Sequence, residues 1–183
     1  MRTVSYRTAA ELLCRGHIGV IPTDTVYGLV SSVRAQQAIE RVYAVKRRSP
    51  EKSCIVLIND LSDLEPFGAS VTDAERQFVE DRWPGPVSVL LSVSRPGALK
   101  ALSGRLAFRL PADRELRALV ARAGPLIAPS ANIENMRPAT TVADADLYFG
   151  SAVDFCVDGG ARFGNPSSLV VINNGGVTVL RQS

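Results

Sequence analysis

The chain alternates short apolar runs with amphipathic segments along its whole length, and this alternation constrains the fold more than any other feature. Strands are expected where the apolar runs fall, at 18–21, 54–58, 87–93, 106–110, 126–128, 155–157 and 169–172. Helices are expected over 8–16, 35–47, 72–82, 113–123 and 141–149. Strands that alternate with helices are typical of an α/β domain. Because the 183 residues contain no internal repeat and no long linker, we expect a single domain spanning 1–183.

Local signals mark where several of these elements begin and turn. Thr8–Glu11 and Thr72–Glu75 both have the spacing of a capping box, so each predicts a helix start. Asn173–Gly176 predicts a turn, after which 177–180 returns as the hairpin partner of 169–172. A hairpin among crossover connections implies a mixed sheet rather than a purely parallel one.

Scarce residue types exclude several kinds of site. The chain has one histidine, His17, and three widely separated cysteines at 14, 54 and 156. This composition leaves no histidine-rich zinc site, no Ser-His-Asp triad with a spare histidine and no Cys-x-x-Cys redox pair. There is no P-loop, and Gly159–Gly164 lacks the dinucleotide fingerprint. An enzyme built from these residues would work by positioning and electrostatics, which suits phosphoryl or nucleotidyl transfer.

Features related to location point to the cytoplasm. Three cysteines without a pairing pattern indicate a reducing compartment. The first residues lack the apolar stretch of a signal peptide. No apolar run approaches the roughly 18 residues that a membrane span needs. We therefore expect a cytoplasmic protein with no membrane partner.

The net charge of +3 is small, but its distribution is uneven. Residues 1–60 hold nine basic and five acidic residues, including the contiguous Lys46, Arg47 and Arg48. This cluster is either a solvated helix end or a patch that contacts phosphates. On a regular helix Lys46 and Arg48 would point apart, so they face one polyanion only if the helix unwinds near Ser49-Pro50.

Three further polar loops follow predicted strands. Pro22–Leu29 combines hydroxyls with a tight glycine, which suits either a small-molecule site or a plain strand connection with a capping aspartate. In Pro129–Asn132, Ser130 and Asn132 alternate, so both face one side in extended backbone, unless the segment is only an Asx or Ser turn. Asp158–Ser168 sets glycine-rich turns beside serines, as in close backbone approach to a ligand or in a surface turn.

Together with Trp83–Ser88 (WPGPVS) and Phe108–Pro111 (FRLP), these loops resemble the YrdC/Sua5 family of threonylcarbamoyl-AMP synthases, in its short bacterial form (TsaC/RimN type). The resemblance extends from Thr8 to Arg181. It implies a twisted α/β sheet with flanking helices and a concave, basic cavity. It also implies an enzyme that combines L-threonine, bicarbonate or CO2, and ATP, releases pyrophosphate and yields L-threonylcarbamoyladenylate. A downstream threonylcarbamoyl transferase complex would then form t6A at adenosine-37 of tRNAs that read ANN codons.

The resemblance assigns roles to particular residues. The catalytic set is Lys46, Arg48, Ser130 and Asn132. ATP would be bound by Arg48, Lys52, Ser130, Asn132 and Arg181. Threonine would be bound by Thr25, Arg109 and Ser167. Mg²⁺ would arrive with the ATP phosphates and take no ligand from protein side chains.

The chain also departs from the family pattern. Arg47 and Leu57 stand where glycine and histidine are common, and Lys52 stands where asparagine is common. The loop Ile133–Pro138 lacks the usual Ser-Gly, and Asn135 would supply the backbone shape of that glycine. Two other functions stay open. One is a double-stranded-RNA-binding, tRNA-binding or ribosome-maturation factor without catalysis, and the other is a carbamoyl-adenylate-forming domain like that of hydrogenase-maturation proteins.

Overall fold

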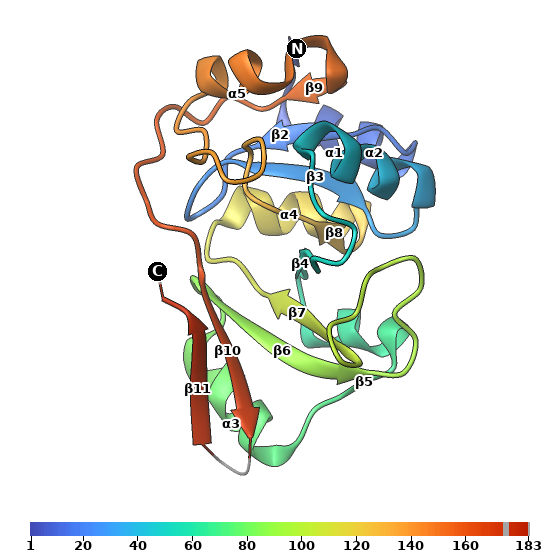
Figure 1. Cartoon of the computed structure of the whole chain (residues 1–183), viewed down its shortest axis with the longest axis vertical. Helices are drawn as coiled ribbons and strands as arrows, with labels where there is room; N and C mark the ends of the chain where they lie inside the picture. Colours follow the sequence, from blue (N-terminus) through green and yellow to red (C-terminus); the bar gives the residue numbers. More distant parts are fainter. Residues whose placement is uncertain (174–175, 183) are drawn as a thin grey trace.

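The strands of the computed structural model, which describes residues 1–173 and 176–182, form one twisted mixed sheet (Figure 1). Within these residues the strand order is β1-β9-β2-β3-β8-β4-β7-β6-β10-β11, with β5 paired to β6. The strands are β1 (Arg2–Thr3), β2 (Gly19–Ile21), β3 (Gly28–Ser32), β4 (Ile55–Leu57), β5 (Ala69–Ser70), β6 (Val87–Val93), β7 (Arg105–Arg109), β8 (Leu126–Ile127), β9 (Phe155–Cys156), β10 (Ser168–Asn173) and β11 (Gly176–Arg181). Parallel pairing of β6 with β10 beside antiparallel pairing of β6 with β7 confirms the mixed sheet.

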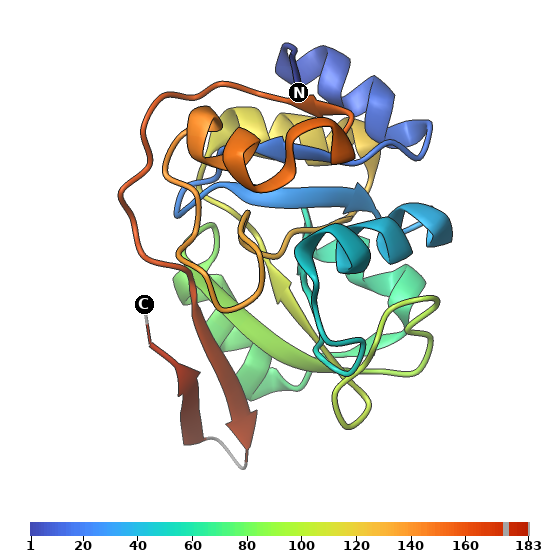
Figure 2. The same cartoon turned by 45° about the horizontal axis from the view of Figure 1, so that its top comes forward.

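The helices cover both faces of the sheet. They are α1 (Tyr6–Cys14), α2 (Gln36–Lys46), α3 (Asp73–Arg82), α4 (Arg114–Ala123) and α5 (Val142–Phe149), with the 3-10 helices η1 (Leu61–Phe67) and η2 (Gly150–Ala152). One hydrophobic core holds α1 and α4, whereas the other holds α2, α3, α5 and η1 (Figures 1 and 2). None of the helices in the described part of the chain is long and apolar enough to span a membrane.

The layer formed by α1 and α4 covers only part of its face. Alternate residues of a strand point to opposite faces of the sheet. Val89 and Phe108 therefore enter the core that holds α3, while Leu90 and Ala107 point the other way. There they form only a small cluster with Val171. This uncovered part of the sheet becomes the floor of the cavity described below.

Most expectations from the sequence are confirmed to within a residue or two. The helices expected over 35–47, 72–82, 113–123 and 141–149 are α2 to α5. The start of α3 has the predicted capping box on Thr72. The register of β10 and β11 confirms their hairpin pairing, while the turn residues 174–175 lie outside the described residues.

Two local expectations are wrong. Helix α1 starts at Tyr6 rather than at Thr8, because Ser5 is its N-cap and the Ser5 Oγ accepts from the Thr8 N–H at 3.2 Å. Part of the expected loop 22–29 is a strand, since β3 begins at Gly28 and pairs antiparallel with β2. The glycine and serines of β3 hide its pattern in the sequence, although the whole strand is buried.

Candidate active site

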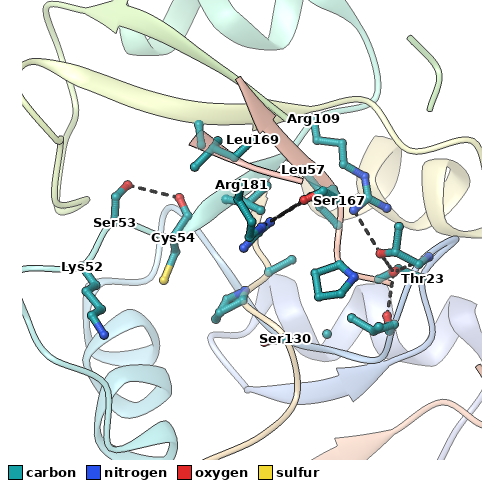
Figure 3. A pocket seen from close by; sticks show the side chains of 18 of the residues that line it. Thr23, Lys52, Ser53, Cys54, Leu57, Arg109, Ser130, Ser167, Leu169 and Arg181 are labelled. Atoms are coloured by element: carbon teal, nitrogen blue, oxygen red, sulfur yellow. Dashed lines mark hydrogen bonds between the residues drawn. The ribbon is translucent and has the colours of Figure 1, made fainter. Parts of the chain in front are cut away.

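A cavity of about 320 Å³ lies over the uncovered part of the sheet (Figure 3). Aliphatic side chains from four strands form its floor: Ile55, Leu57, Leu90, Ala107 and Leu169. The rim is polar and comes from the loops after β2, α2 and β8 and from the end of β11. An apolar floor with a few polar groups placed around it is the usual composition of a small-molecule site.

At one end of the cavity, Arg109 from β7 is held by the loop that follows β2. Its side chain is buried, with 3% of the residue exposed. The Nη1 group donates to Thr25 Oγ1 at 3.2 Å, and Nη2 forms an ion pair with Asp24. The Nε–H has no hydrogen-bond partner among the described residues. Burial lowers the pKa of Arg109 while Asp24 opposes the shift, so a positive charge is held here with little water around it.

Buried hydroxyl groups form two hydrogen-bonded pairs, one of which contacts this guanidinium through Thr25. The Oγ1 atoms of Thr23 and Thr25 lie 2.9 Å apart in a hydrogen bond, and Thr23 Oγ1 also donates to a backbone carbonyl at 2.6 Å. Ser88 and Ser167 are joined in the same way, with 2.9 Å between their Oγ atoms. All four residues are buried. This end of the cavity therefore offers one desolvated cation and several neutral hydroxyls to a small anionic group.

The three residues that the resemblance assigns to threonine all line the cavity. The resemblance assigned no ligand to two of their neighbours, Thr23 and Asp24. The Asp24 carboxylate pairs with Arg109 and accepts from the Ala112 N–H at 2.9 Å. The sequence contains one signal for it, because it is the only acidic residue between Glu11 and Glu40.

The two predicted cations at the end of α2 separate. Arg47 has a left-handed backbone, with φ of 52°, and ends the helix, so Lys46 and Arg48 leave it in different directions. Arg48 lines the cavity, where its Nη2 donates to the Ser53 carbonyl at 2.5 Å. Lys46 is not among the lining residues that the structure describes, and only 2% of it is exposed. The helix does end between the two residues, but of the two only Arg48 lines the cavity, so they do not converge there.

Of Ser130 and Asn132, only Ser130 lines the cavity, although extended backbone would point both residues to one side. Their side chains still contact each other, with Ser130 Oγ 2.7 Å from Asn132 Oδ1. The chain bends between them, and the Asn132 N–H donates to the Ser130 carbonyl at 3.0 Å. Ser130 lines the cavity. Asn132 is buried and turns toward Lys46, whose Nζ donates to its Oδ1 at 2.8 Å. Further along the loop, Asn135 has the expected left-handed backbone, with φ of 68°.

Arg181 reaches the cavity because of a bulge in β11. Leu169 pairs with Arg181 but Val170 pairs with Val179, so Leu180 is an extra residue in the strand. In a regular strand of the same sequence, without the bulge, alternation would put Arg181 on the same face as Val179, toward the core that holds Val170. The bulge places Arg181 on the side of Leu169, which is the cavity side (Figure 3).

Cations outnumber anions around the cavity. The described lining residues include four cations and one carboxylate: Arg48, Lys52, Arg109 and Arg181 against Glu51. Burial lowers the pKa of Arg181, and repulsion from Arg109 and Arg48 adds to the shift. Lys52 is partly neutralised, since its Nζ lies 2.6 Å from Glu134 Oε1. The cavity is therefore suited to a polyanionic ligand.

The lining does not form a metal cage. The described residues contain no group of three or more His, Cys, Asp or Glu able to hold a metal ion. The carboxylate of Glu51 is already paired with Lys100 at 2.8 Å. Mg²⁺ takes six oxygen ligands and is often bound largely through substrate phosphates. A magnesium ion at this cavity would therefore be held mainly by the phosphates of a substrate.

A family model of Sua5, YciO and YrdC proteins, described as "Telomere recombination", matches residues 11–183. The chain belongs to this family. A threonylcarbamoyl-AMP synthase of Idiomarina loihiensis is 32% identical over 170 residues, which cover 88% of this chain and 90% of that protein. A threonylcarbamoyl-AMP synthase of Chromohalobacter salexigens is 32% identical over 171 residues, which cover 91% and 92%.

Two solved structures share the fold of this chain. Sua5 of Pyrococcus abyssi complexed with L-threonine is 26% identical, with a TM-score of 0.89 over 96% of this chain and 53% of that one. HypF in its phosphate- and nucleotide-bound form is 17% identical, with a TM-score of 0.82 over 98% of this chain and 29% of that one. The second likeness shows the fold alone. The expected fold class, a twisted mixed sheet with flanking helices, is confirmed.

Proposed function

We propose that this chain is a threonylcarbamoyl-AMP synthase, which makes L-threonylcarbamoyladenylate from L-threonine, bicarbonate or CO2, and ATP. One observation carries the proposal. A single cavity is lined by the buried cation of Arg109 and by a basic region formed by Arg48, Lys52 and Arg181. An amino acid and a nucleoside triphosphate both carry anionic groups that these cations can bind. The curated relatives named as threonylcarbamoyl-AMP synthases support the same activity.

Threonine binds at the Arg109 end in this proposal. Arginine presents a planar fork that suits a carboxylate, and the fork is already oriented by Asp24 and Thr25. The buried hydroxyls of Thr25 and Ser167 are within the same cavity wall and offer partners to the amino acid. The structure of Pyrococcus abyssi Sua5 complexed with L-threonine supports this choice of amino acid.

ATP occupies the other end, with magnesium carried on its phosphates. Arg48 and Arg181 provide guanidinium groups for the phosphates, and Lys52 provides an ammonium group once it leaves Glu134. Ser130 lies in the wall between the two regions and can contact the nucleotide. Asn132 acts from behind that wall through its hydrogen bond to Ser130.

The chemistry needs no nucleophile from the protein. The threonine amine attacks CO2, forming an N–C bond and releasing one proton, to give an N-carboxylate. An oxygen of that carboxylate attacks the α-phosphorus of ATP in line. A P–O bond forms, the bond from the α-phosphorus to the bridging oxygen breaks, and pyrophosphate leaves with the electron pair. The cations around the cavity stabilise the charge on the phosphates during this step.

The product is a labile mixed anhydride, so it must be passed to an acceptor soon after release. We propose that a threonylcarbamoyl transferase complex in the cytoplasm takes it for t6A synthesis at adenosine-37 of tRNA. Direct binding of tRNA to this chain is a further possibility. The excess of basic residues supports it weakly, since aromatic side chains make up only 6% of the chain.

The deciding experiment is incubation with ATP, bicarbonate and individual labelled amino acids. We expect pyrophosphate release that requires threonine, together with a threonylcarbamoyl-AMP product. Arg48→Ala should abolish release in a folded protein, whereas Arg7→Ala, at an exposed position 78% accessible in its side chain, is the matched control. Arg109→Lys should raise the KM for threonine more than the KM for ATP, because lysine lacks the fork. No release from the wild type, alongside tight tRNA binding, would favour the RNA-binding alternative.

A further inference from the structure

The ammonium group of Lys46 has no hydrogen left for a ligand. Its Nζ lies within hydrogen-bond distance of four acceptors: the Ser130 carbonyl at 2.6 Å, Asn132 Oδ1 at 2.8 Å, the Asn132 carbonyl at 3.0 Å and Ser130 Oγ at 3.5 Å. An ammonium group has three hydrogens, and the three shortest of these contacts use them all. Lys46 is also 2% exposed and lies behind the wall rather than in it. A direct contact with phosphate would require Lys46 to give up one of these bonds.

The contacts of Lys46 fix the orientation of the Asn132 side chain. Because Lys46 can only donate, the Asn132 atom that faces it must be the oxygen. The amide nitrogen then donates to the carbonyls of Ile133 and Met136, both at 2.8 Å. Every polar atom of the Asn132 side chain is therefore engaged within the loop.

The orientation of the Asn132 side chain in turn determines whether the Ser130 hydroxyl donates or accepts a hydrogen bond in the cavity. The Ser130 hydroxyl lies 2.7 Å from Asn132 Oδ1, which can only accept, so the hydroxyl hydrogen points to Asn132. Lys46 Nζ lies 3.5 Å from the same oxygen, which leaves at least one lone pair of Ser130 Oγ for the cavity. It is thus an acceptor for an N–H or O–H group of the ligand rather than a donor to phosphate.

We propose that Lys46 is a positioning residue, which acts through Asn132 to hold Ser130 as a hydrogen-bond acceptor in the cavity wall, and that the phosphate charge falls to Arg48 and Arg181. The proposal rests on the proposed function for the identity of the ligand. The arrangement of the loop does not depend on that identity. Lys46 then belongs to the site through the loop that it organises, and not through contact with substrate.

The electrostatic surroundings agree with this role. Burial lowers the pKa of Lys46 to about 8, and repulsion from Arg48 adds to the shift, while Cys54 and Glu134 oppose it. At neutral pH the amine is protonated and holds all three acceptors. Above pH 8 it loses one donor, and the loop loses part of its support.

The first test uses ligand-free wild-type protein and NMR, so it depends on neither a variant nor an activity. We expect the backbone amide signals of Ser130 and Asn132 to titrate together with Lys46 Nζ between pH 7 and 9, around its pKa of about 8. Amide signals that stay fixed while Lys46 titrates would overturn the proposal. Because this test uses the wild-type protein, it can be done even if substitution of Lys46 prevents folding.

The second test measures pyrophosphate binding by calorimetry. Lys46→Met should change the pyrophosphate Kd by less than about threefold, since no direct hydrogen bond is lost, whereas Arg48→Ala should weaken it about tenfold or more. Equal losses in the two variants would mean that Lys46 contacts phosphate, against the proposal.

The third test separates this inference from the proposed function. In the threonine-dependent assay, Lys46→Met and Ser130→Ala should each lower kcat, and the double variant should fall no further than the worse single variant, because they act in one chain of contacts. Additive losses would contradict a shared pathway. If the wild type shows no threonine-dependent release, the proposed function fails, and the NMR titration still decides the role of Lys46.

Discussion

The ion pair between Arg109 and Asp24 can be broken by Asp24→Asn, which changes charge but hardly changes size. Arg109 is 3% exposed, and the Asp24 side chain is 12% exposed, so both groups have lost most of their water. The Asp24 carboxylate serves two donors, the guanidinium and the Ala112 N–H. The amide keeps one oxygen for them, but the buried positive charge loses its only anionic partner among the described residues.

The expected cost follows from this geometry. Removing one partner of a buried ion pair costs about 3–5 kcal/mol, because the remaining charge stays desolvated and uncompensated. Burial already lowers the pKa of Arg109, which agrees with a strong desolvation penalty. With a urea m-value of about 2 kcal/mol/M, the midpoint of unfolding should fall by about 1.5–2.5 M.

Trp83 provides the assay. It is the only tryptophan in the chain and is 9% exposed within the larger core, so its fluorescence reports on global unfolding. We would measure urea unfolding of the wild type, Asp24→Asn, Arg109→Met and the double variant. The double variant should regain much of the stability that Asp24→Asn loses, since it no longer buries an unpaired charge. It should still lose threonine-dependent activity, because the fork is gone.

A loss below about 1 kcal/mol for Asp24→Asn would place the pair among ordinary solvent-exposed ion pairs. That result would refute the view of Arg109 as a desolvated cation held ready for a carboxylate. The m-value must stay constant for the comparison to be valid, since a change would mean that the unfolded or folded state itself had changed.

Three further perturbations test other parts of the site. The pKa of Lys46 is lowered from 10.5 to about 8, so the unfolded chain binds more protons than the folded one between pH 8 and 10.5. This group should therefore make the folded wild type more stable as the pH rises through that window. The measurement is the urea midpoint of unfolding of the wild type compared with that of Lys46→Met. Gly164→Ala would place a Cβ 2.5 Å from the Thr25 carbonyl, so the KM for threonine should rise while the KM for ATP changes little in steady-state kinetics. Deleting Leu180 removes the bulge and puts Arg181 directly after Val179, so alternation keeps Arg181 on the side of Leu169, in the cavity. The deletion should therefore leave the KM for ATP near the wild-type value, whereas Arg181→Ala should raise it.

Local signals explain which elements could be predicted from the sequence. The capping box at Thr72 and the aspartate cap at Asp113 act within one helical turn, so they mark α3 and α4 without tertiary information. The error at Thr8 has the same local origin, because Ser5 offers an equally good cap three residues earlier. Strand β3 escaped prediction because its two faces are buried in two different cores, Leu29 in one and Val30 in the other, which are completed by helices distant in the sequence.

In the candidate site, too, the sequence indicated some features and not others. The motifs that carry the family resemblance assigned Arg48, Ser130 and Arg181 to ATP and Arg109 and Ser167 to threonine, and all five line the cavity. The partners of these residues could not be predicted in this way. The pairing of Arg109 with Asp24 joins positions 85 residues apart in the sequence, and nothing local marks it.

By itself, then, the sequence determined the helix starts, the apolar strands, the family and the chemical types around the cavity, because these depend on neighbouring residues or on motifs. The tertiary structure decided which polar groups face the ligand and which serve the protein. Lys46 and Arg48 look equivalent in sequence, but the left-handed turn at Arg47 sends one into the wall and the other into the cavity. Arg181 also lines the cavity, because one extra residue in β11 shifts the alternation of its side chains. Directions of this kind depend on backbone geometry and on distant acceptors, which residue types alone do not specify.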